Sequence, residues 1–246
     1  MNPAVQFTAW TGLGNPAAGG VLIIADHASN FVPPDIDLGI APEVLYQHIA
    51  LDIGVADVAR LLVDLGAADC AILGGVSRLV VDLNREPDAI GTIPPSSDGI
   101  DIPGNHISAA ARAARIADYH IPYHDEIAML CAHARPAMIL SLHSFTPVLA
   151  TAATPRPWHI GVLYNEDDRL ARIAIPALAT AGLHVGDQLP YSGKALNYTM
   201  NRHAEGNGIP YLGLEMRQDM VTDAAGQSRF AEIIHQILEK CRNHLA

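Results

Sequence analysis

Three polar side chains come at or just after apolar segments of strand length, and their types suit metal-assisted hydrolysis. These are His27, two residues after 21–25, His143, directly after 138–142, and Glu215, directly after 211–214. Two imidazoles, one further oxygen or nitrogen ligand and an open position describe a catalytic zinc site. The metal lowers the pKa of bound water to about 7 and polarises a carbonyl. A separate carboxylate then serves as general base, a role that suits Glu215.

Segments of strand and helix character alternate along the chain that must position these residues. Strands are predicted at 21–25, 70–73, 77–83, 138–142, 158–163 and 211–216, and helices at 43–65, 108–134, 167–181 and 228–244. This alternation indicates one α/β domain over 1–246, with three layers and helices on both faces of a mostly parallel or mixed sheet. Ligands bind at the carboxyl ends of strands in such sheets. We therefore expect the two histidines, Glu215 and the Asn84–Arg85 pair after 77–83 to meet at one edge.

Two polar segments separate the predicted elements. Residues 84–106 are rich in Pro, Gly and Asp and are expected to form an ordered loop. Residues 186–208 form a second predicted loop, which includes Tyr191 and is a candidate lid. Ser108 is placed to cap the helix that follows it. Pro176 predicts a break or kink in the helix at 167–181.

The charge balance excludes several classes of partner. The 246 residues include 15 Lys and Arg against 26 Asp and Glu, a net charge of −11, and the first basic side chain is Arg60. Nucleic-acid binding needs clustered basic residues, so neither nucleic acid nor an anionic membrane is an expected partner. The first ten residues lack the basic and apolar regions of a secretory signal. Three widely spaced cysteines form no CxxC pair, which favours reduced thiols. These features predict a cytoplasmic protein.

Motifs of the competing enzyme classes are absent from the sequence. There is no GxSxG, no Walker A sequence, no GxGxxG after a strand and no HExxH. The histidines and Glu215 are thus the main candidates for chemistry.

Seven segments in their order resemble the N-formylglutamate amidohydrolase family over nearly the whole chain. They are DHASN (26–30), HIALDIG (48–54), SRLVVDLNR (77–85), IPGN (102–105), YHIPYH (119–124), LHSFTP (142–147) and LEMRQD (214–219). The family is similar to zinc carboxypeptidases and aspartoacylase-type deacylases. The resemblance implies a zinc-exopeptidase-like fold and a Zn²⁺-dependent hydrolase that cleaves an amide beside a carboxylate. The implied substrate is N-formyl-L-glutamate, a small carboxylated N-acyl amino acid, which yields formate and L-glutamate.

The resemblance also implies a ligand set of His27, Asp52 and His143, with Glu215 as the catalytic residue. Zinc carboxypeptidases have a glutamate three residues after the first histidine, where this chain has Asn30. A neutral amide binds zinc less well than a carboxylate. Typical members of the family also have an aspartate in the segment 48–54, so the resemblance implies Asp52 as the third ligand. Asp26 is a candidate hydrogen-bond partner for a ligating histidine.

Five residues are candidates for holding the substrate: Arg78, Asn84, Arg85, His124 and Arg217. The planar fork of an arginine can bind a carboxylate through two hydrogen bonds, and a glutamate-type substrate has two carboxylates. The alternative for each arginine is a structural ion pair, with Asp82 or Asp219 as the partner. His124 is a candidate for lining the site or stabilising an oxyanion.

Three other hypotheses stay open at this point. The same machinery could act on a different acyl group or amino acid. The fold could belong to a non-catalytic domain that binds a metal or a carboxylated ligand. In the third hypothesis there is no metal and the histidines are structural. The sequence does not reveal the oligomeric state.

Overall fold

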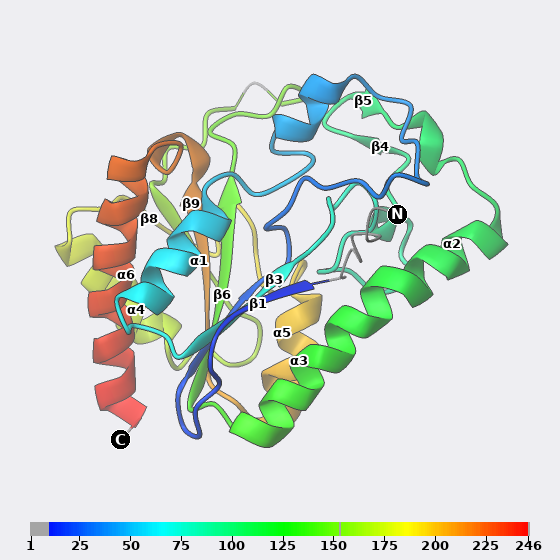
Figure 1. The fold of residues 1–246 in the computed structure, drawn as a ribbon. Coiled ribbons are helices and arrows are strands. Elements are labelled where there is room, and N and C mark those ends of the chain that lie inside the picture. The colour runs from blue at the N-terminus through cyan, green and yellow to red at the C-terminus, as the bar shows by residue number, and fades with distance from the viewer. Residues whose placement is uncertain (1–9, 153, 246) are drawn as a thin grey trace.

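Seven strands form one mixed sheet in the computed structural model, which describes residues 10–152 and 154–245 (Figure 1). They are β1 (Trp10–Gly14), β2 (Val21–Ala25), β3 (Cys70–Gly74), β6 (Met138–Phe145), β7 (Ile160–Leu163), β8 (Val185–Asp187) and β9 (Tyr211–Arg217), in the order β1-β3-β2-β6-β9-β7-β8. The central strands β3, β2, β6 and β9 are parallel. The edge strand β1 is antiparallel to β3, and β7 is antiparallel to β9 but parallel to β8.

Helices cover both faces of this sheet. On one side α1 (Val55–Asp64), α4 (Ala171–Thr180) and α6 (Ala224–Leu245) pack together, and on the other lie α3 (Ile121–Ala134) and α5 (Tyr198–His203) (Figure 1). Helix α2 (Ala109–Arg115) continues into α3 through a π-helical turn at Ile116–His120. The short 3-10 helices are Pro42–Tyr46, Ile90–Thr92, Pro103–Asn105, Glu205–Asn207 and Gln218–Met220. The single α/β domain with a mixed sheet between helices is therefore confirmed.

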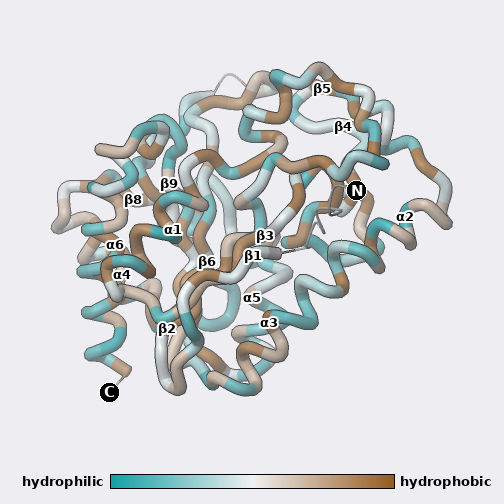
Figure 2. Tube along the Cα trace, viewed as in Figure 1, coloured by the Kyte–Doolittle hydropathy of each residue, from teal (hydrophilic) through white to brown (hydrophobic). Residues whose placement is uncertain are grey.

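The core forms where apolar side chains from the strands and both helix layers meet. Figure 2 shows these apolar residues concentrated along the central strands. All residues of β2 and β6 are buried, as is usual for strands covered on both faces. Helix α6 instead buries residues at helical spacing, including Phe230, Ile234 and Leu238. No helix within the described residues is long and apolar enough to cross a membrane.

Most predicted elements occur with shifted ends. The helix predicted at 108–134 is present as α2, the π-helical turn and α3, and the Ser108 hydroxyl accepts a hydrogen bond from the Ala111 backbone at 3.2 Å. Pro176 lies inside α4 without ending it. The predicted loop 186–208 contains part of β8 and the whole of α5, and 84–106 contains the β4–β5 hairpin (Ser96–Ser97 and Ile100–Asp101). Most of the N-terminal segment used to exclude a secretory signal, residues 1–9, lies outside the described residues.

The prediction of one helix at 43–65 is wrong, because tertiary contacts interrupt it. Between the 3-10 helix and α1 the chain is not helical, and the Asp52 backbone donates a hydrogen bond to the His27 carbonyl at 2.9 Å. Gly54 then has a φ of 79°, and a Cβ at this position would collide with the Val221 carbonyl oxygen. Glycine reaches this left-handed conformation at little cost. The interruption brings Asp52 beside His27.

The strand predicted at 77–83 is also wrong. Its apolar residues are buried as expected, but the backbone forms tight turns instead of pairing in the sheet. The Ser77 hydroxyl donates to the Ala50 carbonyl at 2.8 Å and accepts from the Leu79 backbone at 3.2 Å. The Ser77 carbonyl accepts from the Val80 backbone at 2.8 Å. These turns take up backbone groups that a strand would have used for sheet pairing.

Candidate metal centre and active site

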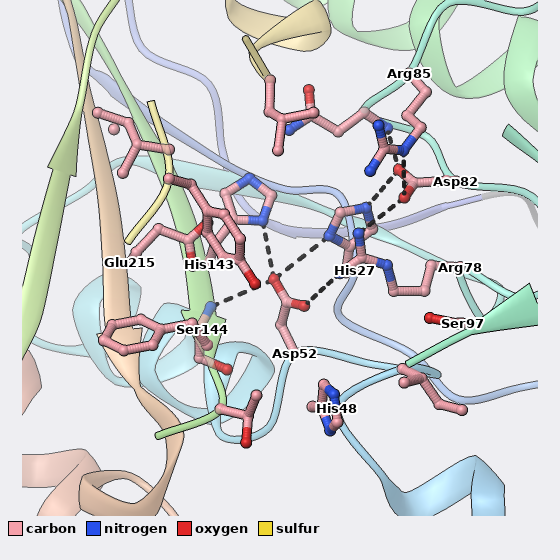
Figure 3. Close-up of a pocket in the computed structure, with 18 of the residues that line it drawn as sticks. His27, His48, Asp52, Arg78, Asp82, Arg85, Ser97, His143, Ser144 and Glu215 are labelled. Atoms are coloured by element: carbon pink, nitrogen blue, oxygen red, sulfur yellow. Dashed lines mark hydrogen bonds and ion pairs between the residues drawn. The ribbon is translucent and has the colours of Figure 1, made fainter. Parts of the chain in front are cut away.

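A pocket lies at the carboxyl ends of the central strands (Figure 3). Its walls come from the end of β2, the segment before α1, the turns at 77–85, the strands β6 and β9, and the loop that contains Tyr191. The β4–β5 hairpin lies over this edge of the sheet and contributes Ser97 to the lining. The pocket therefore lies at the carboxyl ends of the strands, where the positions of His27 and Glu215 in the sequence predict it.

His27, Asp52 and His143 converge in this pocket and are all buried (Figure 3). One ligand atom from each residue lies within 4.8 Å of the other two. Asp52 Oδ2 is 2.9 Å from His143 Nδ1 and 3.4 Å from His27 Nδ1. The structure thus brings together the three residues predicted as metal ligands. Asn30, the alternative ligand, is not among the residues that line the pocket.

A second carboxylate faces the other nitrogen of each imidazole. His27 Nε2 lies 2.8 Å from Asp82 Oδ1. His143 Nε2 lies 3.3 Å from Asp26 Oδ2, an ion-pair distance without hydrogen-bond geometry. Histidine ligands of metals usually have such a partner, which orients the ring. Asp26 was a predicted partner, whereas Asp82 was predicted only as a possible partner for an arginine.

The donor set fits a divalent cation. Four buried carboxylates surround the two imidazoles: those of Asp26, Asp52, Asp82 and Glu215. Two guanidinium groups, those of Arg78 and Arg85, pair with Asp52 and Asp82. With all of these groups ionised and the imidazoles neutral, two negative charges remain uncompensated. Imidazole nitrogen with carboxylate oxygen is a ligand combination that suits zinc.

Without a metal ion, mutual attraction favours the ionised form of Asp52 and the protonated form of His143, and a bound cation would take the place of that proton. Burial by itself raises the pKa of Asp52, but His27, His143 and Arg78 outweigh burial and lower it. Burial lowers the pKa of His143, and the nearby carboxylates of Asp26 and Asp52 outweigh this effect and raise it. The Ser144 backbone N–H also points at Asp52 Oδ2, at 3.3 Å. Asp52 is thus an anion that several groups orient.

Glu215 stands on β9 directly opposite His143 on β6 in the parallel register. It lines the pocket, and its Oε2 is buried without a hydrogen-bond partner among the described residues. Burial, reinforced by the charge of Asp52, raises the pKa of Glu215 to about 7 against the opposing effect of His143. A carboxylate with one free oxygen and a pKa near neutrality can both accept and return a proton.

Three of the five predicted substrate-binding residues line the pocket. Arg78 bridges Asp52 and Asp82, at 3.2 Å and 2.8 Å, which is the ion-pair alternative considered for it. Arg85 is freer, because its side chain is 34% exposed and its Nε lies 3.4 Å from Asp82 Oδ2. The Asn84 side chain accepts a hydrogen bond through Oδ1 from the Thr199 backbone at 2.9 Å. Its amide N–H groups have no hydrogen-bond partner among residues 10–152 and 154–245, so they are available as donors.

The other two predicted residues do not line the pocket. Arg217 donates to Asp219 at 2.8 Å and to the Pro157 carbonyl at 3.2 Å, so it forms the structural pair considered as its alternative. His124 is fully buried and bonds to the Leu83 carbonyl.

Sequence reasoning assigned no role to two polar pairs at the pocket. His48 Nε2 lies 3.1 Å from Asp98 Oδ2, and both residues line the pocket. Arg156 donates to the Tyr191 hydroxyl at 2.9 Å and lies over its ring. His48 and Tyr191 both lay in segments singled out from the sequence. Asp98 lines the pocket and Arg156 contacts the lining residue Tyr191, and both lie in loops, where no periodic pattern marks such residues.

The fold and the site define an α/β protein with a buried His–Asp–His group that could hold a metal ion and a buried carboxylate beside it. The sequence profile of the N-formylglutamate amidohydrolase family matches residues 19–222. The chain therefore belongs to this family, and the resemblance found in its motifs is confirmed. The match includes the three candidate ligands and Glu215.

Two solved structures are similar over almost the full chain. The Agrobacterium tumefaciens gene product Atu2144 is 31% identical, the alignment covers 96% of each chain, and the TM-score is 0.90. The N-formylglutamate amidohydrolase from Ralstonia eutropha JMP134 is 18% identical, with 96% of this chain and 99% of that chain covered and a TM-score of 0.70. At this identity the second likeness shows a shared fold. None of the curated proteins matches the chain.

Proposed function

We propose that this protein is a cytoplasmic, Zn²⁺-dependent amidohydrolase that cleaves the amide bond of a small N-acyl amino acid, with N-formyl-L-glutamate as the first substrate to test. The observation that carries the proposal is the convergence of His27, Asp52 and His143 in one pocket with the unpartnered carboxylate of Glu215. The family match supports the reaction class. The reduced thiols predicted from the cysteine spacing support the location.

His27, Asp52 and His143 would hold the metal ion. Asp82 and Asp26 face the remaining imidazole nitrogens and would keep both rings oriented. When bound, such an ion polarises the amide carbonyl and makes water more acidic.

Glu215 performs the proton transfers. Its free Oε2 accepts a proton from the water whose oxygen attacks the carbonyl carbon of the substrate. The same carboxyl group then gives this proton to the amide nitrogen as the C–N bond breaks. The products are a carboxylic acid, which is formate for the formyl substrate, and a free amino acid.

Asn84 and Arg85 bind the carboxylate that adjoins the scissile amide. Asn84 offers its amide N–H groups, and Arg85 offers a partly exposed guanidinium group in the same pocket. Arg78 is already held by two aspartates and keeps Asp52 and Asp82 in place.

The test is turnover of a panel of N-formyl and N-acetyl amino acids by purified protein, together with elemental analysis. We expect one zinc per chain, hydrolysis of at least one N-acyl amino acid, and loss of activity on chelation. Protein that holds zinc but hydrolyses none of the panel would instead be a binding domain. Protein purified without metal that nevertheless turns over a substrate would contradict the metal-dependent mechanism.

Replacement of Arg85 by lysine should weaken substrate binding. A lysine ammonium is a point charge and cannot reproduce the two parallel hydrogen bonds of a guanidinium fork, so Arg85→Lys should raise KM on the order of tenfold. The α-carboxamide analogue of the substrate should be poor for the wild type and insensitive to this change. Arg60→Lys, at an exposed ion pair on α1, is the matched control. Equal turnover of acid and amide by the wild type would contradict the role of Arg85.

A further inference from the structure

Three histidines outside the pocket lining, His120, His124 and His203, form a buried cluster between α3 and α5. His124 Nε2 lies 2.9 Å from the Leu83 carbonyl oxygen, and His120 Nε2 lies 2.9 Å from the Arg85 carbonyl oxygen. These two carbonyls lie on either side of Asn84. The cluster therefore contacts the backbone at both ends of the segment 83–85, which carries the two proposed carboxylate-binding side chains.

Hydrogen-bond chemistry defines the protonation of these rings. A carbonyl oxygen only accepts, so Nε2 of both His120 and His124 must carry hydrogen. His124 Nδ1 lies 2.9 Å from His203 Nε2, and it accepts from that nitrogen when His124 is neutral. Burial, reinforced by His120, lowers the pKa of His124 to about 3. Burial, reinforced by Arg202, lowers the pKa of His203 to about 4. The charge of Asp26 opposes both shifts without cancelling them. Both rings are therefore neutral near pH 7, with His124 as a fixed donor to Leu83.

The start of α5 holds the same segment through side-chain and backbone contacts. The Thr199 backbone donates to Asn84 Oδ1 at 2.9 Å, which directs the Asn84 amide nitrogen away from α5. The Tyr198 ring packs against His120 and His124, with centroid separations of 5.6 Å and 5.1 Å. Asn84 and Arg85 thus stand on a backbone that the π-helical turn, α3 and α5 all contact.

We propose that His120 and His124 are positioning residues for substrate binding. By donating to the carbonyls of Leu83 and Arg85 they keep the Asn84 amide and the Arg85 guanidinium in the geometry that binds the substrate carboxylate. The inference rests on the proposed function for the nature of the substrate. It assigns to His124 a role behind the pocket wall, in place of the direct contact expected from the sequence. Misplacement of a binding group by about 1 Å can cost on the order of 100-fold in rate, so the effect is measurable.

The experiment compares His120→Phe with His120→Gln. Phenylalanine fills the space without donating, whereas the glutamine amide can still donate to the Arg85 carbonyl. For His120→Phe we expect kcat/KM for the N-acyl amino acid to fall about 10- to 100-fold, mainly because KM rises. The kcat/KM for the α-carboxamide analogue should not change. In His120→Gln, kcat/KM for the N-acyl amino acid should return to within about threefold of the wild-type value. Zinc content should be the same in all three proteins.

A merely structural role predicts a different pattern, in which the acid and the amide lose activity together. That result, or an unchanged kcat/KM for the acid in folded His120→Phe, would overturn the inference. Where His120→Phe fails to fold, His120→Gln decides. A folded His120→Gln protein whose kcat/KM falls more than about tenfold for the acid substrate, but not for the carboxamide, contradicts the donor role.

Direct binding separates failure of this inference from failure of the proposed function. If the wild type hydrolyses no N-acyl amino acid, the proposed reaction is wrong, and calorimetric titration with L-glutamate still reports on carboxylate binding. We expect the Kd for L-glutamate to rise about 10- to 100-fold in His120→Phe and to be close to the wild-type value in His120→Gln. An identical Kd in the wild type and His120→Phe, or no binding of L-glutamate by the wild type, would overturn the inference.

Discussion

Glu215→Gln is expected to lower kcat by about 10²- to 10⁴-fold, the usual contribution of general acid–base catalysis. Glutamine keeps the size and hydrogen-bonding shape of the side chain, but it cannot accept the proton of the attacking water. Glu215 is buried at the pocket wall with Oε2 free, so the change removes a proton acceptor without opening a cavity. The variant should therefore stay folded and retain its zinc.

Single-turnover kinetics, zinc analysis and thermal unfolding on the same preparation test this expectation. Glu239→Gln, an exposed position on α6 far along the chain from the pocket residues, is the matched control and should keep wild-type kcat. A Glu215→Gln protein with full zinc and near-normal kcat would refute the catalytic role. A large fall in Tm with little change in kcat would identify Glu215 as a structural charge partner.

Loss of a metal ligand should have the second largest effect. His27→Ala and His143→Ala each remove one imidazole from the group of three. We expect their zinc affinity to fall by more than the roughly 10- to 100-fold typical of residues that only hydrogen-bond to a ligand. Zinc content after dialysis and Kd from competition with a chromogenic chelator measure the effect. A variant that retains a full equivalent of tightly bound zinc would show that its residue is not a ligand.

Asp52→Asn and Asn30→Ala separate the two candidates for the third ligand. Asparagine keeps the shape of Asp52 and removes the anionic oxygen that lies near both imidazoles. Zinc affinity should therefore drop strongly in Asp52→Asn and remain at the wild-type level in Asn30→Ala, whose residue does not line the pocket. The reverse ranking would favour ligand spacing like that of zinc carboxypeptidases.

The sequence alone predicted five of the seven strands (β2, β3, β6, β7 and β9), their alternation with helices, and the end of the sheet where the candidate site lies; it missed the outer strands β1 and β8. The reason is local: a buried parallel strand reads as a short apolar run, and the first polar residues after it must lie at its carboxyl end. His27 lies just after β2, whereas His143 and Glu215 lie within the last residues of β6 and β9, whose parallel register places them side by side. The motif segments supplied the family, which the profile match confirms.

Only the tertiary structure decided how Asp52 and the segment 77–85 reach the pocket. Asp52 lies in a stretch with helical periodicity, and that periodicity is overridden by the backbone bond to His27 and by close packing of Gly54 against Val221. Ser77 likewise turns an apolar run away from strand pairing by binding its own neighbours and Ala50. The partner of each charge was decided in the same way: Arg217 pairs locally with Asp219, while Arg85 remains partly exposed at the pocket. The positions of Asp52 and of the segment 77–85 depend on contacts between residues far apart in the chain, which periodicity and spacing do not encode.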